Sequence, residues 1–124
     1  MSQDATICWT DIPVIDLDRA IAFYAAVLGQ PVTKQGQGGF VFGLLPHAPG
    51  QVSGCLCRTE DNQPSEQGPL VYLNVLGRID EALAAVVPAG GKVLQPKHPI
   101  GPYGFRAVIV DSEGNRVALH SQAA

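Results

Sequence analysis

A chain of 124 residues is long enough for one domain with a sizeable hydrophobic core and too short for two. Apolar residues make up 46% of it, which excludes a disordered protein. Eight Lys and Arg residues against eleven Asp and Glu residues give a formal net charge of -3 with no basic run. We therefore expect neither nucleic acid nor a membrane surface as a partner.

The sequence also bears on the compartment. The first residues show no basic stretch followed by an apolar run, the pattern of a secretory leader. No apolar stretch approaches the roughly 18 residues that span a membrane. The three cysteines are odd in number, and Cys55 and Cys57 are too close in sequence to bridge without strain. We therefore expect a cytoplasmic protein with reduced thiols.

The first half of the chain predicts a strand, a helix and three short strands. Residues 7–14 form an apolar run of strand length. Asp16 follows as an N-cap, the apolar residues of 17–28 recur at helical spacing, and Gly29 ends the helix. Further strands are expected over 30–34, 39–44 and 53–58, separated by loops rich in Gly, Pro and Gln.

The second half repeats this order. A strand is expected over 70–75, and a helix that begins at Ile79 must stop near Pro88. Strands are expected over 92–95, 105–110 and 116–120, and Gly114 favours a tight hairpin between the last two because glycine adopts positive φ without strain. Arg78 stands where Asp16 stands in the first half, so the second helix lacks an acidic cap and should be shorter and weaker. The repeat predicts an α+β fold of two βαβββ modules, about residues 5–60 and 69–122.

Three blocks resemble signatures of the vicinal oxygen chelate superfamily, which includes glyoxalase I, bleomycin- and fosfomycin-resistance proteins and extradiol dioxygenases. The blocks are IPVIDLDRAIAFY at 12–24, GGKV at 90–93 and DSEGNRVAL at 111–119. The resemblance covers the whole chain as one domain, residues 1–124, and implies a glyoxalase-like fold whose curled mixed sheet surrounds a concave cavity. It also implies a small organic molecule as partner and a homodimer that closes the cavity. It does not specify the reaction, since this fold carries many.

The resemblance further implies four metal-ligand positions, one on each of four strands, where the enzymes of the family carry His, Glu or Gln. These positions are Trp9, Leu70 or Val71, Ala118, and one of Gly54, Cys55 and Leu56. Three of the four hold side chains that cannot ligate a metal, and a single thiolate from the fourth strand lacks partners. We therefore expect no metal and no cofactor, so that metal-assisted chemistry lacks its electrophile.

Strand alternation assigns the side chains that face the cavity. With residue 9 pointing inward, alternate residues of the first, fifth and eighth strands share its face. The candidate ligand-binding residues on these faces and on the loop before the seventh strand are Trp9, Asp11, Tyr72, Asn74, Tyr103 and His120. We expect Trp9 to be buried near Tyr72. An inward acid needs a partner or water, and Arg116 or Arg106 could be the partner of Asp11.

These features favour a small-molecule-binding protein, or a metal-independent enzyme, on a glyoxalase/bleomycin-resistance scaffold. Whether any catalysis occurs is left open, because no nucleophile with an adjacent base is visible. One alternative is a metal-dependent lyase or dioxygenase of the glyoxalase type with unusual ligands drawn from His120, Cys55, Cys57 or Asp11. Another is a regulatory or interaction module with a collapsed cavity. A cavity above about 300 Å³ would disfavour that second alternative.

Overall fold

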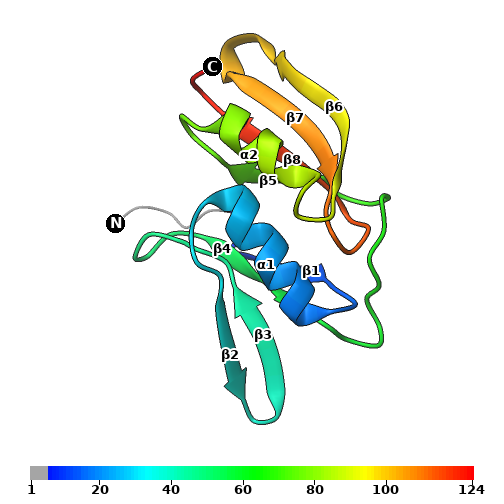
Figure 1. The fold of residues 1–124 in the computed structure, drawn as a ribbon. Coiled ribbons are helices and arrows are strands. Elements are labelled where there is room, and N and C mark those ends of the chain that lie inside the picture. The colour runs from blue at the N-terminus through cyan, green and yellow to red at the C-terminus, as the bar shows by residue number, and fades with distance from the viewer. Residues whose placement is uncertain (1–5) are drawn as a thin grey trace.

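The structure, a computed structural model, describes residues 6–124. It contains two four-stranded sheets and two helices, arranged as the same βαβββ order twice (Figure 1). Residues 1–5 lie outside the described residues. They include the expected start of the first module, near residue 5, and the segment where a secretory leader would begin. No helix within residues 6–124 is long and apolar enough to cross a membrane.

The two modules have the same sheet topology, which confirms the predicted α+β fold. Module 1 consists of β1 (Trp9–Pro13), α1 (Leu17–Leu28), β2 (Thr33–Gln37), β3 (Phe40–Leu44) and β4 (Ser53–Cys57), in the sheet order β1-β4-β3-β2. Module 2 consists of β5 (Val71–Asn74), α2 (Ile79–Val86), β6 (Lys92–Pro99), the 3-10 turn η1 (Gly101–Tyr103), β7 (Phe105–Val110) and β8 (Arg116–Ser121), in the order β5-β8-β7-β6. β1 and β5 run parallel to β4 and β8, and the other neighbours are antiparallel. The first strand of each module is therefore an edge strand.

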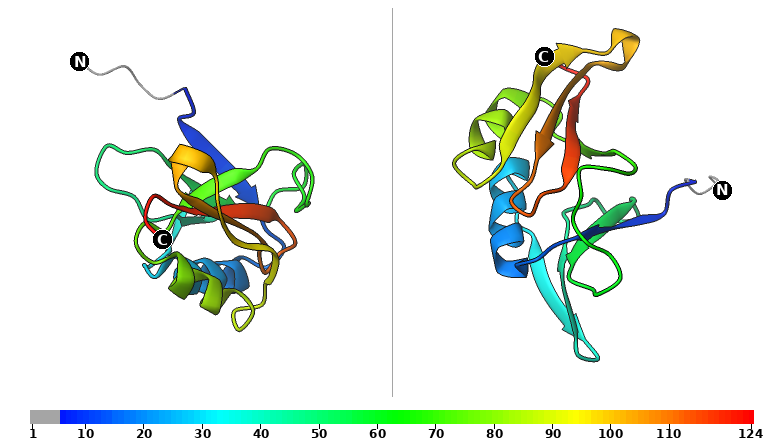
Figure 2. Two further views of the ribbon diagram at one scale, coloured as in Figure 1. Left: turned by 90° about the horizontal axis from the view of Figure 1, so that it is seen from above. Right: turned by 90° about the vertical axis from the view of Figure 1, so that its right-hand side faces the viewer.

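One hydrophobic core joins the two modules. α1 and α2 lie side by side and contact each other, α1 against the first sheet and α2 against the second (Figures 1 and 2). Phe23 and Tyr24 of α1 and Ile79 of α2 are almost fully buried in a single cluster that also takes side chains from both sheets. Burying such side chains is the dominant stabilising term in folding, so neither helix has an independent core.

The burial pattern confirms the predicted strand faces. Ile12 of β1, Leu73 of β5 and Leu119 of β8 belong to the buried core, whereas Trp9 and Tyr72 lie on the opposite faces of their strands and remain exposed. Because side chains alternate along a strand, the residues expected to face away from the helices do so.

The ends of α1 follow the predicted capping. The side chain of Asp16 accepts a hydrogen bond from the Arg19 backbone N–H at 3.1 Å, and Gly29 takes φ 70° and donates to the Ala25 carbonyl. α2 is shorter, 8 residues against 12, and its N-cap residue Arg78 makes no capping side-chain bond. The Arg78 guanidinium instead donates to the Val27 carbonyl in the last turn of α1, at 2.7 Å. Arg78 therefore leaves the N-terminus of α2 without a side-chain cap and instead supplies a hydrogen-bond donor to the C-terminal turn of α1.

The second strand was predicted at residues 30–34, and that was wrong by three residues. β2 spans Thr33–Gln37 and pairs with β3 from Gln37 opposite Phe40. Gly38 and Gly39 form the two-residue turn with φ 61° and 85°, the mirror-image turn that suits the twist of a hairpin. This turn, and not the apolar pattern of the preceding residues, fixes which residues of β2 pair with β3.

The sixth strand was predicted over 92–95 and extends to Pro99 instead. Two register shifts, at Val93–Gln95 and Gln95–His98, carry it past Pro96. Proline is tolerated there because β6 is an edge strand whose free N–H side needs no partner. The extension places His98 opposite Arg106 of β7 rather than in a loop.

Candidate functional site

A cleft of about 860 Å³ opens between the two edge strands β1 and β5. Its walls come from β1, the start of β4, the whole of β5 and the loop between β3 and β4. The lining residues are Ile7, Trp9, Thr10, Leu28, Gln30, Leu45, Pro46, His47, Ala48, Val52, Ser53, Gly54, Pro69, Leu70, Val71, Tyr72, Leu73 and Asn74. Apolar and aromatic walls with a few polar groups, in a volume of this size, are typical of sites for small organic ligands.

Three of the six candidate ligand-binding residues line this cleft. They are Trp9, Tyr72 and Asn74. The Asn74 side-chain oxygen accepts the Leu76 backbone N–H at 2.9 Å, which leaves the amide NH₂ available to a ligand. Sequence reasoning missed the loop that carries His47, because a Pro- and Gly-rich connection gives no signal of the wall it will form.

Tyr72 is held by hydrogen bonds that link its hydroxyl to Arg106 and Arg106 to His98, on the face of the second sheet that points away from α2. Its hydroxyl accepts from Arg106 at 2.8 Å, and the same guanidinium donates to Nε2 of His98 at 3.1 Å. The ring of His120 lies edge-on to that of Tyr72, with 6.2 Å between centroids. Because the Tyr72 oxygen already accepts a hydrogen bond from Arg106, its O–H group is left to donate to another acceptor.

Tyr103 and His120 lie outside the residues that line the cleft. His120 Nε2 lies 2.7 Å from the Tyr103 carbonyl oxygen, so η1 is fastened to β8 through backbone rather than through the phenol. The Tyr103 side chain itself is 67% exposed. Of the four candidate residues on module 2, only Tyr72 and Asn74 therefore line the cleft.

Trp9 and Asp11 differ from expectation in their surroundings. Trp9 is 45% exposed rather than buried, because an edge strand leaves one flank of the indole uncovered. Its Nε1 donates to Asp11 Oδ1 at 3.0 Å, and the Cys55 thiol donates to the same oxygen at 3.3 Å. The expected pairing of Asp11 with an arginine was therefore wrong: Arg106 is engaged by Tyr72, and Asp11 finds its donors on its own sheet.

Two thiols and one carboxylate gather on the face of module 1 that points away from α1. Asp11 of β1 is the register partner of Cys55 of β4, and Cys57 follows two residues later on the same face. The ligand atoms of all three lie within 4.8 Å of one another. Burial raises the pKa of Cys55 to about 12 and raises that of Cys57, so both thiols stay protonated at neutral pH. The expectation that a thiol on this strand lacks partners was wrong, because two strands contribute to the cluster.

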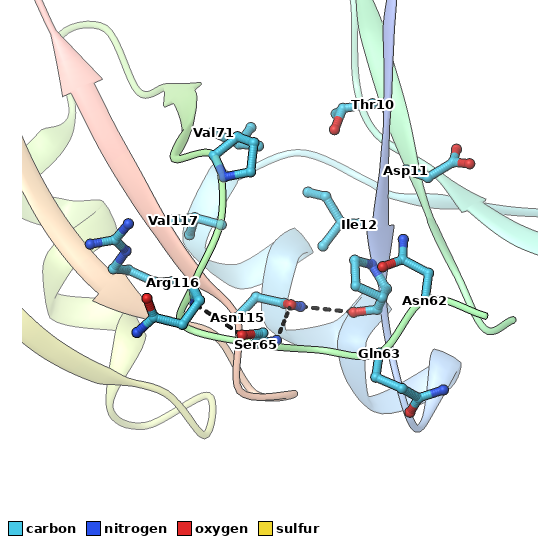
Figure 3. Close-up of a pocket in the computed structure, with 13 residues that line it drawn as sticks. Thr10, Asp11, Ile12, Asn62, Gln63, Ser65, Val71, Asn115, Arg116 and Val117 are labelled. Atoms are coloured by element: carbon cyan, nitrogen blue, oxygen red, sulfur yellow. Dashed lines mark hydrogen bonds between the residues drawn. The ribbon is translucent and has the colours of Figure 1, made fainter. Parts of the chain in front are cut away.

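A smaller cavity of about 250 Å³ lies further along the same seam, between β1, β8 and the segment that connects the modules (Figure 3). Asn115 spans it. Its Nδ2 donates to the Pro13 carbonyl at 2.8 Å, and its Oδ1 accepts the Ser65 backbone N–H at 3.2 Å. This cavity is below the usual size for an organic ligand.

The β7–β8 hairpin ties module 2 to the start of α1. Glu113 accepts the backbone N–H groups of Ile15 and Asp16, both at 2.8 Å, and pairs with Arg19 at 2.8 Å. Burial by itself raises the pKa of Glu113, but the hydrogen bonds from Arg19, Asp16, Ser112 and Ile15 outweigh it and lower that pKa to about 2. A carboxylate at a helix N-terminus is stabilising, so the hairpin acts as a clasp that fixes the edges on either side of the cleft.

Asp111 extends this clasp into the core. It accepts hydrogen bonds from the buried Tyr24 hydroxyl and from the backbone N–H groups of Glu113 and Asn115. Burial, and then the charge of Asp111, raises the pKa of Tyr24 well above its usual value. The sequence predicted a hairpin at these residues and gave no sign of their partners on α1.

The positions to which the resemblance assigns metal ligands hold no suitable donor set. Trp9 and Leu70 present an indole and an aliphatic group to the cleft, and Ala118 is fully buried with only a methyl group. None of these carries a free lone pair for a divalent cation. The residues present therefore do not fit a metal at the family's positions.

The sequence matches the Glyoxalase/Bleomycin resistance protein/Dioxygenase superfamily over residues 6–119. No curated protein matches the chain significantly in sequence. Among solved structures, a glyoxalase/bleomycin resistance protein from Albidiferax ferrireducens is 19% identical with a TM-score of 0.72, over 94% of this chain and 98% of that one. A glyoxalase-related enzyme from Fulvimarina pelagi is 13% identical with a TM-score of 0.69, over 94% of this chain and 87% of that one.

A mutant of glyoxalase I from Zea mays is 23% identical with a TM-score of 0.69. The similarity covers 93% of this chain and 45% of the maize chain, so this chain corresponds to less than half of that enzyme. At these identities the likeness is one of fold.

Proposed function

The chain belongs to the glyoxalase/bleomycin resistance protein/dioxygenase superfamily, and from this premise we propose that it binds a small organic molecule between β1 and β5 without a metal at the family's positions. The observation that carries the proposal is the cleft of about 860 Å³, walled by Trp9, Leu70 and Tyr72. Its size argues against a module with a collapsed cavity. The donor chemistry of the residues at the family's ligand positions argues against a family-type metal.

The polar groups at the cleft define the ligand class. Tyr72 O–H and the Asn74 amide can both donate, and they lie two residues apart on the same face of β5. A flat organic molecule that carries an acceptor oxygen, such as a carbonyl compound, would stack on Trp9 and accept from these donors. A metal-independent reaction in the cleft would have Tyr72 as its proton donor, because the Tyr72 side chain lines the cleft.

The proposed assembly is a cytoplasmic homodimer in which the two modules of each chain act as one domain. The shared core of α1 and α2 supports a single domain. Exposed apolar side chains beside the cleft, Ile7, Val52 and Leu76, offer a surface for a second copy. The three cysteines are free, as in a reducing compartment.

The emission of Trp9 tests the ligand proposal, because Trp9 is the single tryptophan. A set of small aromatic and aliphatic carbonyl compounds is titrated against the protein. A compound that enters the cleft covers the exposed indole and shifts its emission to shorter wavelength. We expect Tyr72→Phe and Asn74→Ala each to weaken this response by about three- to tenfold, the loss of one hydrogen bond.

Tyr103→Phe is the matched control, since it removes only a hydroxyl group that lies outside the cleft. It should bind as the unmodified protein does. The proposal fails when no compound of the set shifts the emission, or when Tyr103→Phe weakens the response as much as Tyr72→Phe.

A further inference from the structure

The geometry points to a binding site for one thiophilic divalent cation, Zn²⁺ in kind, formed by Asp11, Cys55 and Cys57. These residues lie on two neighbouring parallel strands, and their ligand atoms lie within 4.8 Å of one another. Neither cysteine lines the cleft between β1 and β5, so the site stands apart from the ligand site proposed above. Of its residues, only Cys55 is among the positions to which the resemblance assigns a ligand, whereas Asp11 lies two residues beyond Trp9 along β1 and Cys57 lies two residues beyond Cys55 along β4.

The distances suit tetrahedral coordination. The Cys55 Sγ lies 3.3 Å from Asp11 Oδ1. Ligands at about 2.3 Å for sulfur and about 2.0 Å for oxygen around a tetrahedral zinc ion lie about 3.5 Å apart. This pair is thus already spaced for coordination, and the Cys57 Sγ lies within 4.8 Å of both of its atoms and completes a set of three.

Trp9 holds the carboxylate in place. Its indole N–H donates to Asp11 Oδ1 at 3.0 Å, the kind of outer contact that orients a ligating carboxylate. The two thiols are buried while Asp11 is exposed. An ion therefore approaches from the carboxylate side, and its fourth position faces outward to water.

The donor set selects the ion. Each thiol binds as a thiolate, so the binding of one ion releases two protons to solvent and transfers no electron. Two thiolates and one carboxylate then carry three negative charges around a doubly charged ion. Sulfur ligands favour Zn²⁺ and Cd²⁺ over Mg²⁺ and Ca²⁺, which prefer oxygen.

The test is a titration of the reduced full-length protein with Cd²⁺, followed by the ultraviolet thiolate-to-cadmium charge-transfer band. We expect the band to saturate at one ion per chain, with a change in Trp9 emission that runs in parallel, and no response to Mg²⁺. Asp11→Asn, at an exposed position where refolding is not in question, should weaken Cd²⁺ binding by about tenfold or more. Cys57→Ser should lower the intensity of the band.

Two controls separate this site from other sources of binding. Cys8→Ser removes the exposed thiol outside the cluster, and His120→Ala removes an imidazole of module 2. Both should bind Cd²⁺ as the unmodified protein does. The assignment is overturned when Cys8→Ser or His120→Ala abolishes binding, when Asp11→Asn leaves it unchanged, or when the protein shows no band. The charge-transfer band arises from the thiolates, and the organic compounds are titrated against the unmodified, metal-free protein, so the failure of either proposal is read independently of the other.

Discussion

Glu113 is the residue on which the contact between the modules depends most directly, since its carboxylate satisfies two backbone donors and one guanidinium of module 1. Replacing Glu113 with Gln removes the charge and the pairing with Arg19, and should lower the free energy of unfolding by about 1–3 kcal/mol. Urea denaturation at neutral pH measures the loss. Glu66→Gln, on the exposed segment between the modules, should change nothing measurable.

The same residue predicts a dependence on pH. The pKa of Glu113 is about 2 in the folded protein against an ordinary value of 4.5. A depressed pKa means that the unfolded chain binds the proton more readily, so the stabilisation is complete above pH 4.5 and is lost as the pH falls towards 2. Denaturation midpoints of the protein and of Glu113→Gln should therefore converge between these pH values. A difference that persists unchanged at pH 2 contradicts the assignment.

Strand alternation predicted which residues of β1, β5 and β8 face away from the core, because that face follows from the period of two. It did not predict that Asp11 meets Cys55. That contact depends on the register between two parallel strands 44 residues apart in sequence, which no local pattern fixes. The expectation that Trp9 is buried was wrong because the order of strands in the sheet also depends on tertiary pairing, and the sequence does not reveal that β1 is an edge strand.

At the scale of elements, the β7–β8 hairpin depends on Gly114. This residue has φ 102°, and a Cβ there would meet nothing within 4 Å. The cost of Gly114→Ala is therefore conformational rather than steric, and we expect a loss of about 1–3 kcal/mol in urea denaturation. Gly36→Ala in β2 is the matched control, since its φ is unstrained and its Cβ makes ordinary contacts, so it should be close to neutral. Equal losses in the two variants would contradict the argument.

The order and type of the elements could be predicted because strong signals mark them: Asp16 and Gly29 bound α1, and the shorter α2 follows from the missing cap. The residues at which β2 and β6 begin and end could not be predicted. β2 takes its register from the Gly38–Gly39 turn, and β6 passes through Pro96 because nothing pairs with its outer edge. The bounds of both strands depend on their pairing with a neighbouring strand.

For the whole molecule, we predict a dimer in sedimentation velocity. Val52 is exposed and lines the cleft, so Val52→Lys should shift the protein towards monomer, because a charge at an apolar contact is costly to bury. Val87→Lys, exposed at the end of α2 and outside the cleft, should leave the association unchanged. A monomer at all concentrations, or dissociation by Val87→Lys alone, would refute this assembly.

The repeat of βαβββ modules predicted the architecture of the whole molecule, since each half carries the same sequence of signals. The clasp between the halves could not be predicted in the same way. Its partners are separated by as many as 102 residues, and a hairpin sequence is sufficient to explain Asp111, Glu113 and Asn115 without any of those contacts.

The clasp also constrains the order in which the chain reaches its native state. The carboxylate that satisfies the backbone donors of Ile15 and Asp16 belongs to Glu113, which is synthesised 98 and 97 residues after them. Until the hairpin appears, the first helix starts without its final acceptor, although α2 is already available to cover its apolar face. Contacts of such long separation close slowly because a large loop must be ordered first. During translation, module 1 therefore cannot acquire its complete set of hydrogen bonds until the β7–β8 hairpin of module 2 has been synthesised.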